Sequence, residues 1–600
     1  MKPARSFILA LFLLSFSALV AQPRRHSERP FWRPVVMSKE AMVAAEHPLE
    51  AMAAIHIMQQ GGNAIDAAVA VFYMTSVVEQ HQAGVGGDGF LLAYIAKEDK
   101  VVFINGTGPA PKLATRDFYK KQGGIPDSGP LSTAVPGALR GFDLALKRYG
   151  TLDYRTILQP AIESAAKGHP LTFWAASQHG INLARIRPYD SSVKILTDDG
   201  RAPKPGWMFY QQDLAETLKT VATEGGDAFY SGSLAHLSAD FYKNKGGLLS
   251  YEDLSSYQAE ESEPIMTTYK GLDVYQSAPN SQGIVMLIAL NILEGFELAK
   301  LEHNSSQYIH LIVEAMKLAF ADRNAYIGDP RFVQDMPIKG LLSKEYAAKR
   351  RALIRLDQAM SLKAPPGDPQ KIEGILEGYR VEYEKGPIPI ERNSKAKETG
   401  ETSSFSIADR FGNLVSVTHS VNFGFGSGMI VEGGGYVLND RMLNFSLEEN
   451  NVNVLVPGKR PRHTVNPALA MKNGRPYLAW NTPGGDNQPQ AMLQAFLNIV
   501  IFGMNVQQAV EAPTVTSTAF AASTYPQEVE GQLTLPRVLA EYIGGDLARK
   551  GHRVNVVKLQ QPYMQTTSGA GGVKMIMISP DNGVIMGGVS PAKNNYVLGL

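Results

Sequence analysis

The chain has no cysteine among its 600 residues. Disulfide bonds, thiolate metal sites and a cysteine nucleophile are therefore excluded, so any nucleophile must be an oxygen or an amine. The formal net charge is only +1, and no block of lysine and arginine is interleaved with aromatic residues. This balance argues against a protein that binds nucleic acid.

Sequence signatures of metal and nucleotide sites are also missing. The 12 histidines show no His-Glu-x-x-His spacing, and the glycine-rich stretch GVGGDGF has no Gly-Lys-Ser/Thr after it. These two patterns are the ones that would indicate a zinc site or a phosphate-binding loop. We therefore expect no metal and no other cofactor.

Long hydrophobic runs are confined to the N-terminus. Lys2 and Arg5 precede an apolar run over residues 7–20, which is shorter than the ~20 residues that span a membrane. We predict that residues 1–21 are a signal peptide, although Leu19 is larger than the small residue usual two places before the cleavage site. A membrane anchor is the alternative. The prediction places the mature chain in the periplasm or outside the cell, with no stable membrane insertion.

The rest of the chain mixes helical and strand patterns. Helices are expected over residues 47–62, from the N-cap Asn63 onward, over 305–330 and over 487–503, and strands over 403–409, 414–420, 436–440 and a hairpin within 467–485. Between 364 and 401 the sequence is rich in proline, lysine, glutamate and glycine, which predicts an exposed, mobile segment. Helices together with antiparallel strands favour sheets covered by helices.

Thr402 opens the first of these hairpin strands, directly after Glu401. If the bond between them were cut, Thr402 would carry a free α-amine with an unperturbed pKa of roughly 7.7–8.0. One residue would then supply both a hydroxyl nucleophile and its general base. Threonine is common in strands, so the residue alone favours an edge-strand position with a solvated hydroxyl over a nucleophile.

Motifs along nearly the whole mature chain resemble the γ-glutamyltransferase family of N-terminal-nucleophile hydrolases. They are GGNAIDAAVA, GVGGDGF, TAVPGALRGFD, EAMKLAFADRNAYIGDP, TSSFSIADRFGN, FGSGMIV, VLNDRMLNF and TPGGDNQPQ. The resemblance implies an α+β fold with four layers (αββα), in which two stacked antiparallel sheets are covered by helices. It also implies a precursor that cuts itself between Glu401 and Thr402, giving a large subunit, 22–401, and a small subunit, 402–600.

The resemblance assigns the catalytic residues. Thr402 corresponds to the nucleophile, and Ser420 stands where the family usually has a threonine that helps hold the nucleophile and its amine. Asn422 matches an asparagine that contacts the substrate. Gly484 and Gly485 match the pair that forms the oxyanion hole, whereas the residues alone indicate a plain turn from strand to helix.

The substrate-binding positions depart from the family pattern. An arginine that meets the α-carboxylate is replaced by Thr107, and an aspartate that meets the α-ammonium is replaced by Asn444. A glutamine is replaced by Arg441, and two serines become His463 and Thr464. Because charge-assisted hydrogen bonds are roughly twice as strong as neutral ones, these changes should weaken recognition of an α-amino acid head group.

Three hypotheses follow. The first is a self-processing γ-glutamyltransferase-like amidohydrolase that transfers an acyl group from glutathione or a related amide to water or an amine. The second is an acylase for carboxyacyl amides without the α-amine, such as glutaryl amides, because Arg441 could still meet a carboxylate. The third is a periplasmic binding protein without turnover, which the combination of Thr402, Ser420, Asn422 and the glycine pair argues against.

Overall fold

The computed structural model describes residues 33–392, 400–556 and 572–600. The predicted signal peptide, residues 1–21, lies outside these ranges, as do residues 393–399 of the segment 364–401. Over the described ranges, no helix combines the length and the apolar character needed to cross a membrane.

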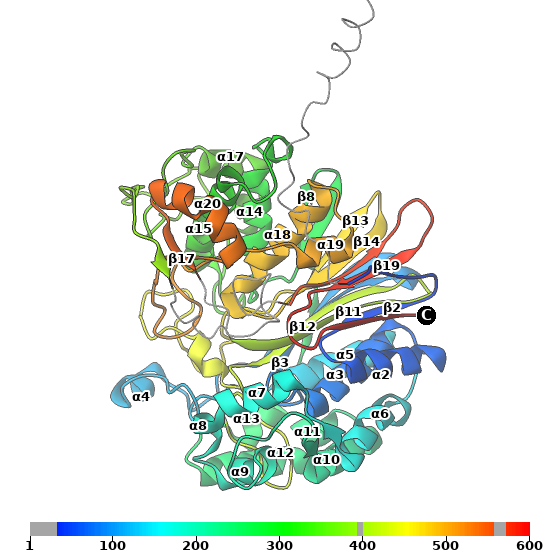
Figure 1. The fold of residues 1–600 in the computed structure, drawn as a ribbon. Helices are drawn as coiled ribbons and strands as arrows, with labels where there is room; N and C mark the ends of the chain where they lie inside the picture. Colours follow the sequence, from blue (N-terminus) through cyan, green and yellow to red (C-terminus); the bar gives the residue numbers. More distant parts are fainter. Residues whose placement is uncertain (1–32, 393–399, 557–571) are drawn as a thin grey trace, which may run out of the picture.

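Two large antiparallel sheets form the centre of the molecule (Figure 1). The first sheet contains the predicted hairpin, and its strands in spatial order are β20 (Tyr596–Gly599), β2 (Met42–Ala45), β11 (Glu401–Ala408), β12 (Leu414–Asn422), β3 (Asp88–Ile95), β4 (Lys100–Gly106) and β7 (Glu260–Ser262). The second sheet is ordered β1 (Val36–Ser38), β19 (Ile585–Val589), β18 (Lys574–Ile578), β14 (Arg475–Asn481), β13 (Ala468–Lys472), β9 (Leu272–Gln276) and β8 (Ile265–Tyr269).

An apolar layer lies between the two sheets. Phe90 and Leu92 of the first sheet belong to the same buried cluster as Leu469 and Ile576 of the second. Burying such side chains stabilises the fold by roughly 25 cal/mol per Å² of apolar surface removed from water. The sheets are therefore held face to face by their inner side chains.

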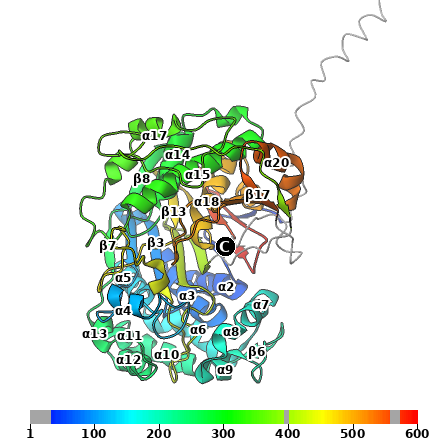
Figure 2. The ribbon, with the colours of Figure 1, turned by 90° about the vertical axis from the view of Figure 1, so that its left-hand side faces the viewer.

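Helices cover the outer face of the first sheet (Figures 1 and 2). Phe405 and Val417 of the hairpin pack in one cluster with these helices. Asn63 caps one of them as predicted, because its side chain accepts hydrogen bonds from the N–H groups of Ile65 and Asp66. The layer and its outer helices comprise α2 (Pro48–Gln59), α3 (Ala64–Val78), α5 (Ala138–Tyr149), α6 (Tyr154–Lys167), α10 (Gln212–Glu224), α11 (Asp227–Tyr230) and α12 (Ser233–Asn244).

A second helical layer covers the outer face of the second sheet. Trp480 of β14 stacks on Phe496, with 5.1 Å between the ring centroids, and the helix predicted over 305–330 begins after the cap Ser305. The layer consists of α14 (Ile284–Leu293), α15 (Ser306–Tyr326), α18 (Gln488–Val500), α19 (Val506–Glu511) and α20 (Arg537–Arg549). The expected αββα architecture is thereby confirmed.

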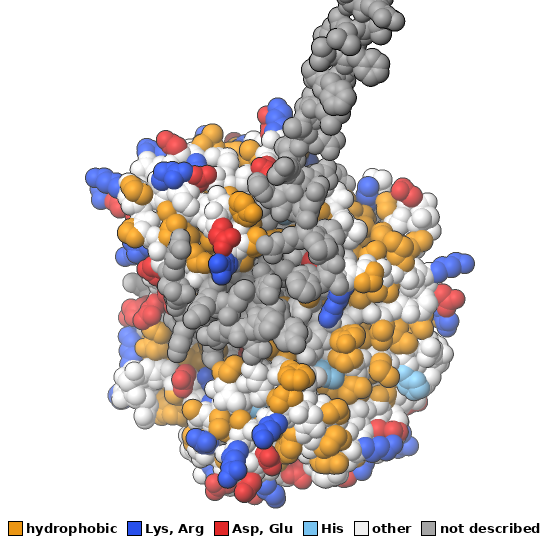
Figure 3. Space-filling view, in the orientation of Figure 1, with side chains coloured by type: hydrophobic (Ala, Val, Ile, Leu, Met, Phe, Trp, Pro, Cys, Tyr) orange, Lys and Arg blue, Asp and Glu red, His pale blue; other side chains and the backbone are white. Residues whose placement is uncertain are grey.

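Smaller elements complete the fold. A four-stranded mixed sheet and a two-stranded sheet lie beside the main layers, with short helices on the connections. Their bounds are β10 (Glu391–Arg392), β17 (Arg553–Val556), β16 (Gln532–Leu535), β15 (Thr516–Ser517), β5 (His169–Pro170), β6 (Met208–Phe209), α4 (Arg116–Lys121), α7 (Phe173–Ile181), α8 (Leu183–Ile186), α9 (Asp190–Leu196), α13 (Tyr251–Ser255), α16 (Ile338–Leu341) and α17 (Lys344–Arg351). Charged side chains of both signs are interspersed over the face seen in Figure 3.

The structure contradicts one expectation about local structure and restricts a second. Residues 436–440 form only isolated bridges instead of a strand, because Val437 and Leu438 pair singly with Ile430 and Gly86. The segment 364–401 is not uniformly exposed, since residues 365–369 are buried. Arg350 explains part of that burial, because its guanidinium donates to the carbonyl oxygen of Pro365 at 2.9 Å.

Candidate active site

Thr402 lies near the start of β11, in the interior of the first sheet, and is only 2% exposed. The pairing with β12 shifts register between Glu401 and Ser403, so Thr402 occupies an irregular position in the ladder. The interpretation as an edge-strand residue with a solvated hydroxyl is therefore wrong. The sheet thus buries this threonine directly after the Glu401–Thr402 peptide bond.

Ser420 faces that peptide bond from the neighbouring strand β12. Its hydroxyl donates a hydrogen bond of 2.6 Å to the carbonyl oxygen of Glu401. The same hydroxyl accepts a hydrogen bond of 2.7 Å from the N–H of Asn422. A donor on the carbonyl oxygen favours negative charge there, which is what attack on this carbonyl would create.

Asn422 ends β12 in a backbone conformation that is unusual for a residue with a side chain, with φ of 89°. Its side-chain oxygen accepts a hydrogen bond of 3.0 Å from Arg441, and its side-chain N–H group donates to the Asp440 carbonyl oxygen at 3.3 Å. Strained backbone that is held by its surroundings is concentrated at functional sites. Asn422 also lines a pocket beside the hairpin.

The glycine pair lies across the site from the hairpin. Gly484 and Gly485 both have positive φ, 118° and 55°, and a 3₁₀ turn (Gly485–Asn487) leads into α18. A Cβ atom on Gly485 would lie 3.5 Å from the backbone nitrogen of Gly400. The turn thus contacts the chain just before Glu401, and the start of α18 brings the N–H groups of a helix terminus to this place.

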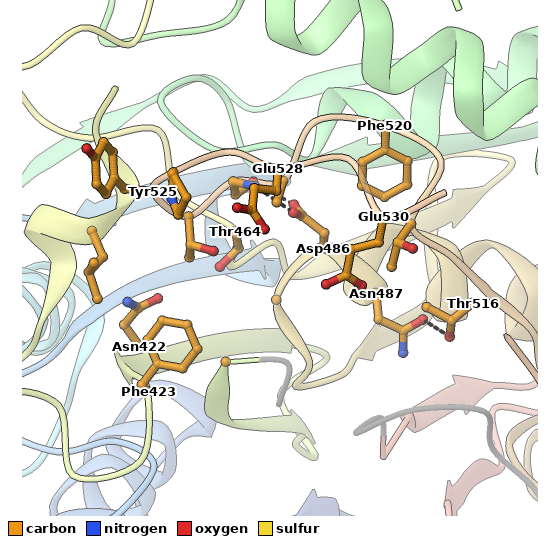
Figure 4. A pocket seen from close by; sticks show the side chains of 18 of the residues that line it. Asn422, Phe423, Thr464, Asp486, Asn487, Thr516, Phe520, Tyr525, Glu528 and Glu530 are labelled. Carbon is orange, nitrogen blue, oxygen red and sulfur yellow. Dashed lines mark hydrogen bonds between the residues drawn. The ribbon is translucent and has the colours of Figure 1, made fainter. Parts of the chain in front are cut away.

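A pocket of about 540 Å³ opens at this point. Its inner wall includes Gly400, Asn422, Thr464 and Gly485, and Figure 4 shows Tyr525, Phe520, Glu528 and Glu530 among the side chains around it. All four of these side chains come from the segment 516–530, whose role no sequence pattern indicated. The pocket therefore joins the predicted nucleophile region to a loop far along the chain.

Arg441 is buried behind Asn422, in a 3₁₀ turn (Arg441–Asn444). Its Nε atom is 4.0 Å from a carboxylate oxygen of Asp88. Within the described part of the chain, the Nε and NH2 groups of Arg441 and the Nδ2 group of Asn444 have no hydrogen-bond partner. Burial lowers the pKa of Arg441 to about 10, so the side chain stays cationic at neutral pH. Unpaired buried donors of this kind are costly unless a ligand completes them.

The other predicted substrate residues are distributed around this group. The Nε2 atom of His463 lies 3.4 Å from Asp88, and burial, with a smaller effect of Arg441, lowers the pKa of His463 to about 4. Thr464 lines the pocket. The hydroxyl of Thr107 donates to Asn105 at 2.6 Å instead and does not line the pocket. Of the five, only Thr464 reaches the pocket wall, and Arg441, Asn444 and His463 lie in the layer behind it.

Sequence reasoning missed two charged residues near the site. Asp88 belongs to GVGGDGF, whose aspartate was assigned no role from the sequence. It accepts a hydrogen bond of 2.9 Å from Gly108 N–H and faces His463 and Arg441. Lys593 lies 3.4 Å from the Glu401 carboxylate. No short sequence pattern links Lys593 to Glu401, because the two residues are 192 positions apart.

One group of metal-ligand type occurs among the described residues, away from the pocket. His310, Glu314 and His552 place potential ligand atoms within 4.8 Å of one another. The two histidines are already hydrogen-bonded to each other at 2.8 Å, and Lys317 lies 2.8 Å from Glu314. Internal contacts therefore already engage all three side chains, since Glu314 also accepts a hydrogen bond from the N–H of Met360. Spacing in the sequence could not reveal it, because His552 is 242 residues from His310.

Comparisons with known proteins agree with this geometry. The family model described as gamma-glutamyltranspeptidase matches residues 51–600. A glutathione hydrolase proenzyme of Bacillus subtilis is 32% identical over 99% of this chain and 97% of its own. An acylase proenzyme of a Pseudomonas species is 34% identical over 90% of each chain. The crystal structure of a cephalosporin acylase from Bacillus halodurans superposes with a TM-score of 0.83 and 33% identity, covering 96% of this chain and 98% of that one.

Proposed function

The chain belongs to the gamma-glutamyltranspeptidase family, and we propose that it is a self-processing amidohydrolase in which Thr402 is the nucleophile of both self-cleavage and turnover. The observation that carries this proposal is the 2.6 Å hydrogen bond from Ser420 to the Glu401 carbonyl oxygen. It places a donor on the one peptide bond whose cleavage would turn Thr402 into a chain terminus.

Self-cleavage would begin with attack of the Thr402 hydroxyl oxygen on the Glu401 carbonyl carbon. The new C–O bond forms as the C–N bond breaks, and the hydroxyl proton passes to the departing nitrogen, which becomes the α-amine of Thr402. Water then hydrolyses the ester, which leaves a carboxylate on Glu401 and restores the hydroxyl. Ser420 would stabilise the oxyanion of this step.

Turnover would repeat the chemistry on an amide substrate. The α-amine of Thr402, with an unperturbed pKa of roughly 7.7–8.0, would take the hydroxyl proton as general base. Backbone N–H groups of the Gly484–Gly485 turn would stabilise the oxyanion. Its collapse would leave the acyl group as an ester on the Thr402 oxygen and expel the substrate's amine, which takes the proton held by the α-amine. Water or an acceptor amine would then attack the ester and release the acyl group. Since Gly400 lines the pocket and lies against Gly485, cleavage would also free the chain end that covers this turn.

We propose further that the two fragments remain one unit after cleavage. In the first sheet, strands from before and after Thr402 are interleaved and pair with each other at three places: β20 with β2, β2 with β11, and β12 with β3. Separating the fragments would break these three ladders and those between β1 and β19 and between β13 and β9 in the second sheet, and it would expose the core between them. Co-elution of fragments 22–401 and 402–600 on a sizing column, after export directed by residues 1–21, is the expected behaviour.

The acyl donor is proposed to be a γ-glutamyl amide such as glutathione, as the names of the related hydrolases suggest. A second candidate, a carboxyacyl amide without an α-amine, is favoured by the buried Arg441, whose Nε and NH2 groups have no hydrogen-bond partner among the described residues. Arg441 lies behind the pocket wall, so an anionic group of the substrate would have to extend past that wall to pair with these donors. Asn444, which is neutral, offers no fixed negative charge to an ammonium.

Purified wild-type enzyme and the Thr402→Ala variant test the proposal on γ-glutamyl- and glutaryl-p-nitroanilide. Hydrolysis of at least one compound by the wild type, with none by Thr402→Ala, is the expected result. Faster hydrolysis of the glutaryl compound would select the second candidate. Equal activity of Thr402→Ala and the wild type would refute the assigned nucleophile.

A further inference from the structure

A cluster of buried charges lies next to the predicted cleavage site. Glu46 is at its centre, with the ammonium of Lys574 at 2.8 Å and that of Lys593 at 3.0 Å from its two carboxylate oxygens. All three side chains are at most 2% exposed. Buried ion pairs contribute little to stability on balance but fix their partners in place, since removal of one partner leaves an uncompensated charge.

Lys593 also reaches the residue before the nucleophile. Its ammonium lies 3.4 Å from the carboxylate of Glu401 and donates a hydrogen bond of 2.5 Å to the side-chain oxygen of Gln82. The ring of Trp174 lies 5.3 Å from the same ammonium. Burial disfavours the charge, but Glu46 and Glu401 outweigh it and raise the pKa of Lys593. The lysine is therefore a cation held from several sides.

The loop that carries Lys593 is itself held in place. Asn594 donates to the hydroxyl of Thr172 at 2.7 Å, and the side chain of Asn595 donates to the carbonyl oxygens of Ser590 and Ala592 at 3.0 and 2.6 Å. The ammonium consequently has little freedom to follow a moving Glu401. The Lys593 ammonium therefore holds the Glu401 side chain in one position.

We infer that Lys593 is a positioning residue for self-cleavage, which acts by holding the Glu401 side chain. The inference rests on the proposed self-processing function. Lys593 lies within ion-pair distance of the Glu401 carboxylate, and Ser420 donates a hydrogen bond to the Glu401 carbonyl oxygen. Together these interactions fix the orientation of the Glu401–Thr402 peptide plane relative to the Thr402 hydroxyl. Orientation of the reacting groups accounts for much of the acceleration of intramolecular steps.

The N-to-O acyl shift needs this help because the strand ladder is irregular at Thr402. The register shift between Glu401 and Ser403 leaves the peptide between them without regular pairing to β12. The contact between the side chains of Lys593 and Glu401 supplies the positioning that regular backbone hydrogen bonds would otherwise provide. After cleavage, Glu401 belongs to the other fragment, so this contact serves the cleavage step and not the later turnover.

The test follows cleavage of the full chain in cell-free synthesis, with intact-mass measurement of precursor and fragments over time. Lys593→Met and Glu401→Gln should each slow cleavage about tenfold or more, and the double variant should be no slower than the slower single variant. Lys593→Arg should restore most of the rate. The loss in cleavage rate should exceed any loss in kcat of the processed fraction at least tenfold.

Lys574→Met is the matched control, because Lys574 pairs with the same Glu46 but its hydrogen bonds go to Glu46, Ser404 and Gly572. Cleavage of this variant within about threefold of the wild-type rate, at a comparable loss of thermal stability, would support the inference. Wild-type cleavage rates in both Lys593→Met and Glu401→Gln would overturn it while leaving the proposed function intact. Failure of the wild type itself to cleave would overturn both. Glu401→Gln keeps the test decisive should Lys593→Met not fold.

Discussion

The hydroxyl of Ser420, on β12, lies 2.6 Å from the carbonyl oxygen of Glu401, the first residue of the neighbouring strand β11. The contact brings together three features that an N-terminal nucleophile requires: a buried threonine, a peptide bond before it that can be cut, and a hydrogen-bond donor on the carbonyl oxygen of that bond.

Ser420→Ala removes the donor and should slow self-cleavage about a hundredfold, since loss of one oxyanion donor costs about 10²–10³ in rate. Ser420→Thr keeps the hydroxyl and should stay within a few-fold of the wild type. Time courses on denaturing gels measure both, and equal rates for Ser420→Ala and the wild type would remove the assigned role.

The glycine turn provides a second prediction. Gly485→Ala puts a side chain at φ of 55°, where it is strained by about 1–2 kcal/mol, and should displace the N–H groups that face the oxyanion. We expect kcat of the processed enzyme to fall at least about tenfold with little change in KM. Gly474→Ala is the control, because Gly474 has φ of 73° with nothing within 4 Å of the added Cβ atom and lies in the turn from β13 to β14. A similar loss of kcat in both variants would point to general strain instead.

A third prediction is that Arg441 and Asn444 determine which acyl group the enzyme prefers, according to the charges that the group carries. Arg441→Gln should lower kcat/KM for glutaryl-p-nitroanilide about tenfold or more, because a charge-assisted hydrogen bond is worth about 1.5–3 kcal/mol. Adding Asn444→Asp supplies a negative partner for an ammonium and should shift preference toward the γ-glutamyl compound. Unchanged ratios of the two kcat/KM values in both variants would show that the acyl group is recognised elsewhere.

The pH dependence of stability offers a fourth prediction. Burial lowers the pKa of His169 from 6.5 to about 4, and neither ring nitrogen has a hydrogen-bond partner among the described residues. Below pH 6.5 the unfolded chain binds a proton here that the folded chain does not, so stability present above this pH is lost as the pH falls toward 4. His169→Phe should reduce the acid slope of the free energy of unfolding by up to about 1.4 kcal/mol per pH unit. Denaturant titrations at several pH values measure it, and an unchanged slope would contradict the assignment.

Local features of the sequence predicted local features of the structure. The hairpin of β11 and β12 was predictable because its apolar residues alternate, and Phe405 and Val417 do pack together against the helices. The polar residues that alternate with them do not face water, however. Ser406 and Ser416 accept hydrogen bonds of 2.8 and 3.0 Å from Asn481 of the second sheet. A period of two cannot distinguish solvent from a polar layer between sheets.

The residues that complete the site could not be predicted because they are distant in the chain. Glu401 and Lys593 are separated by 192 residues, and His463 meets Asp88 through a fold that no short pattern encodes. The positions of Arg441 and Asn444 behind Asn422 depend likewise on a 3₁₀ turn. The family resemblance indicated Arg441, Asn444 and His463 but not Asp88 or Lys593. Only the packing of the two sheets shows that Thr107 hydrogen-bonds to Asn105 instead of lining the pocket.

The most direct test is the mass of each fragment in catalytically active material. The account predicts two fragments, of which the lighter begins with Thr402 and carries a free α-amine, and a single inactive chain for Thr402→Ala. Active protein that consists of one uncut chain, or whose lighter fragment starts at any other residue, would contradict it.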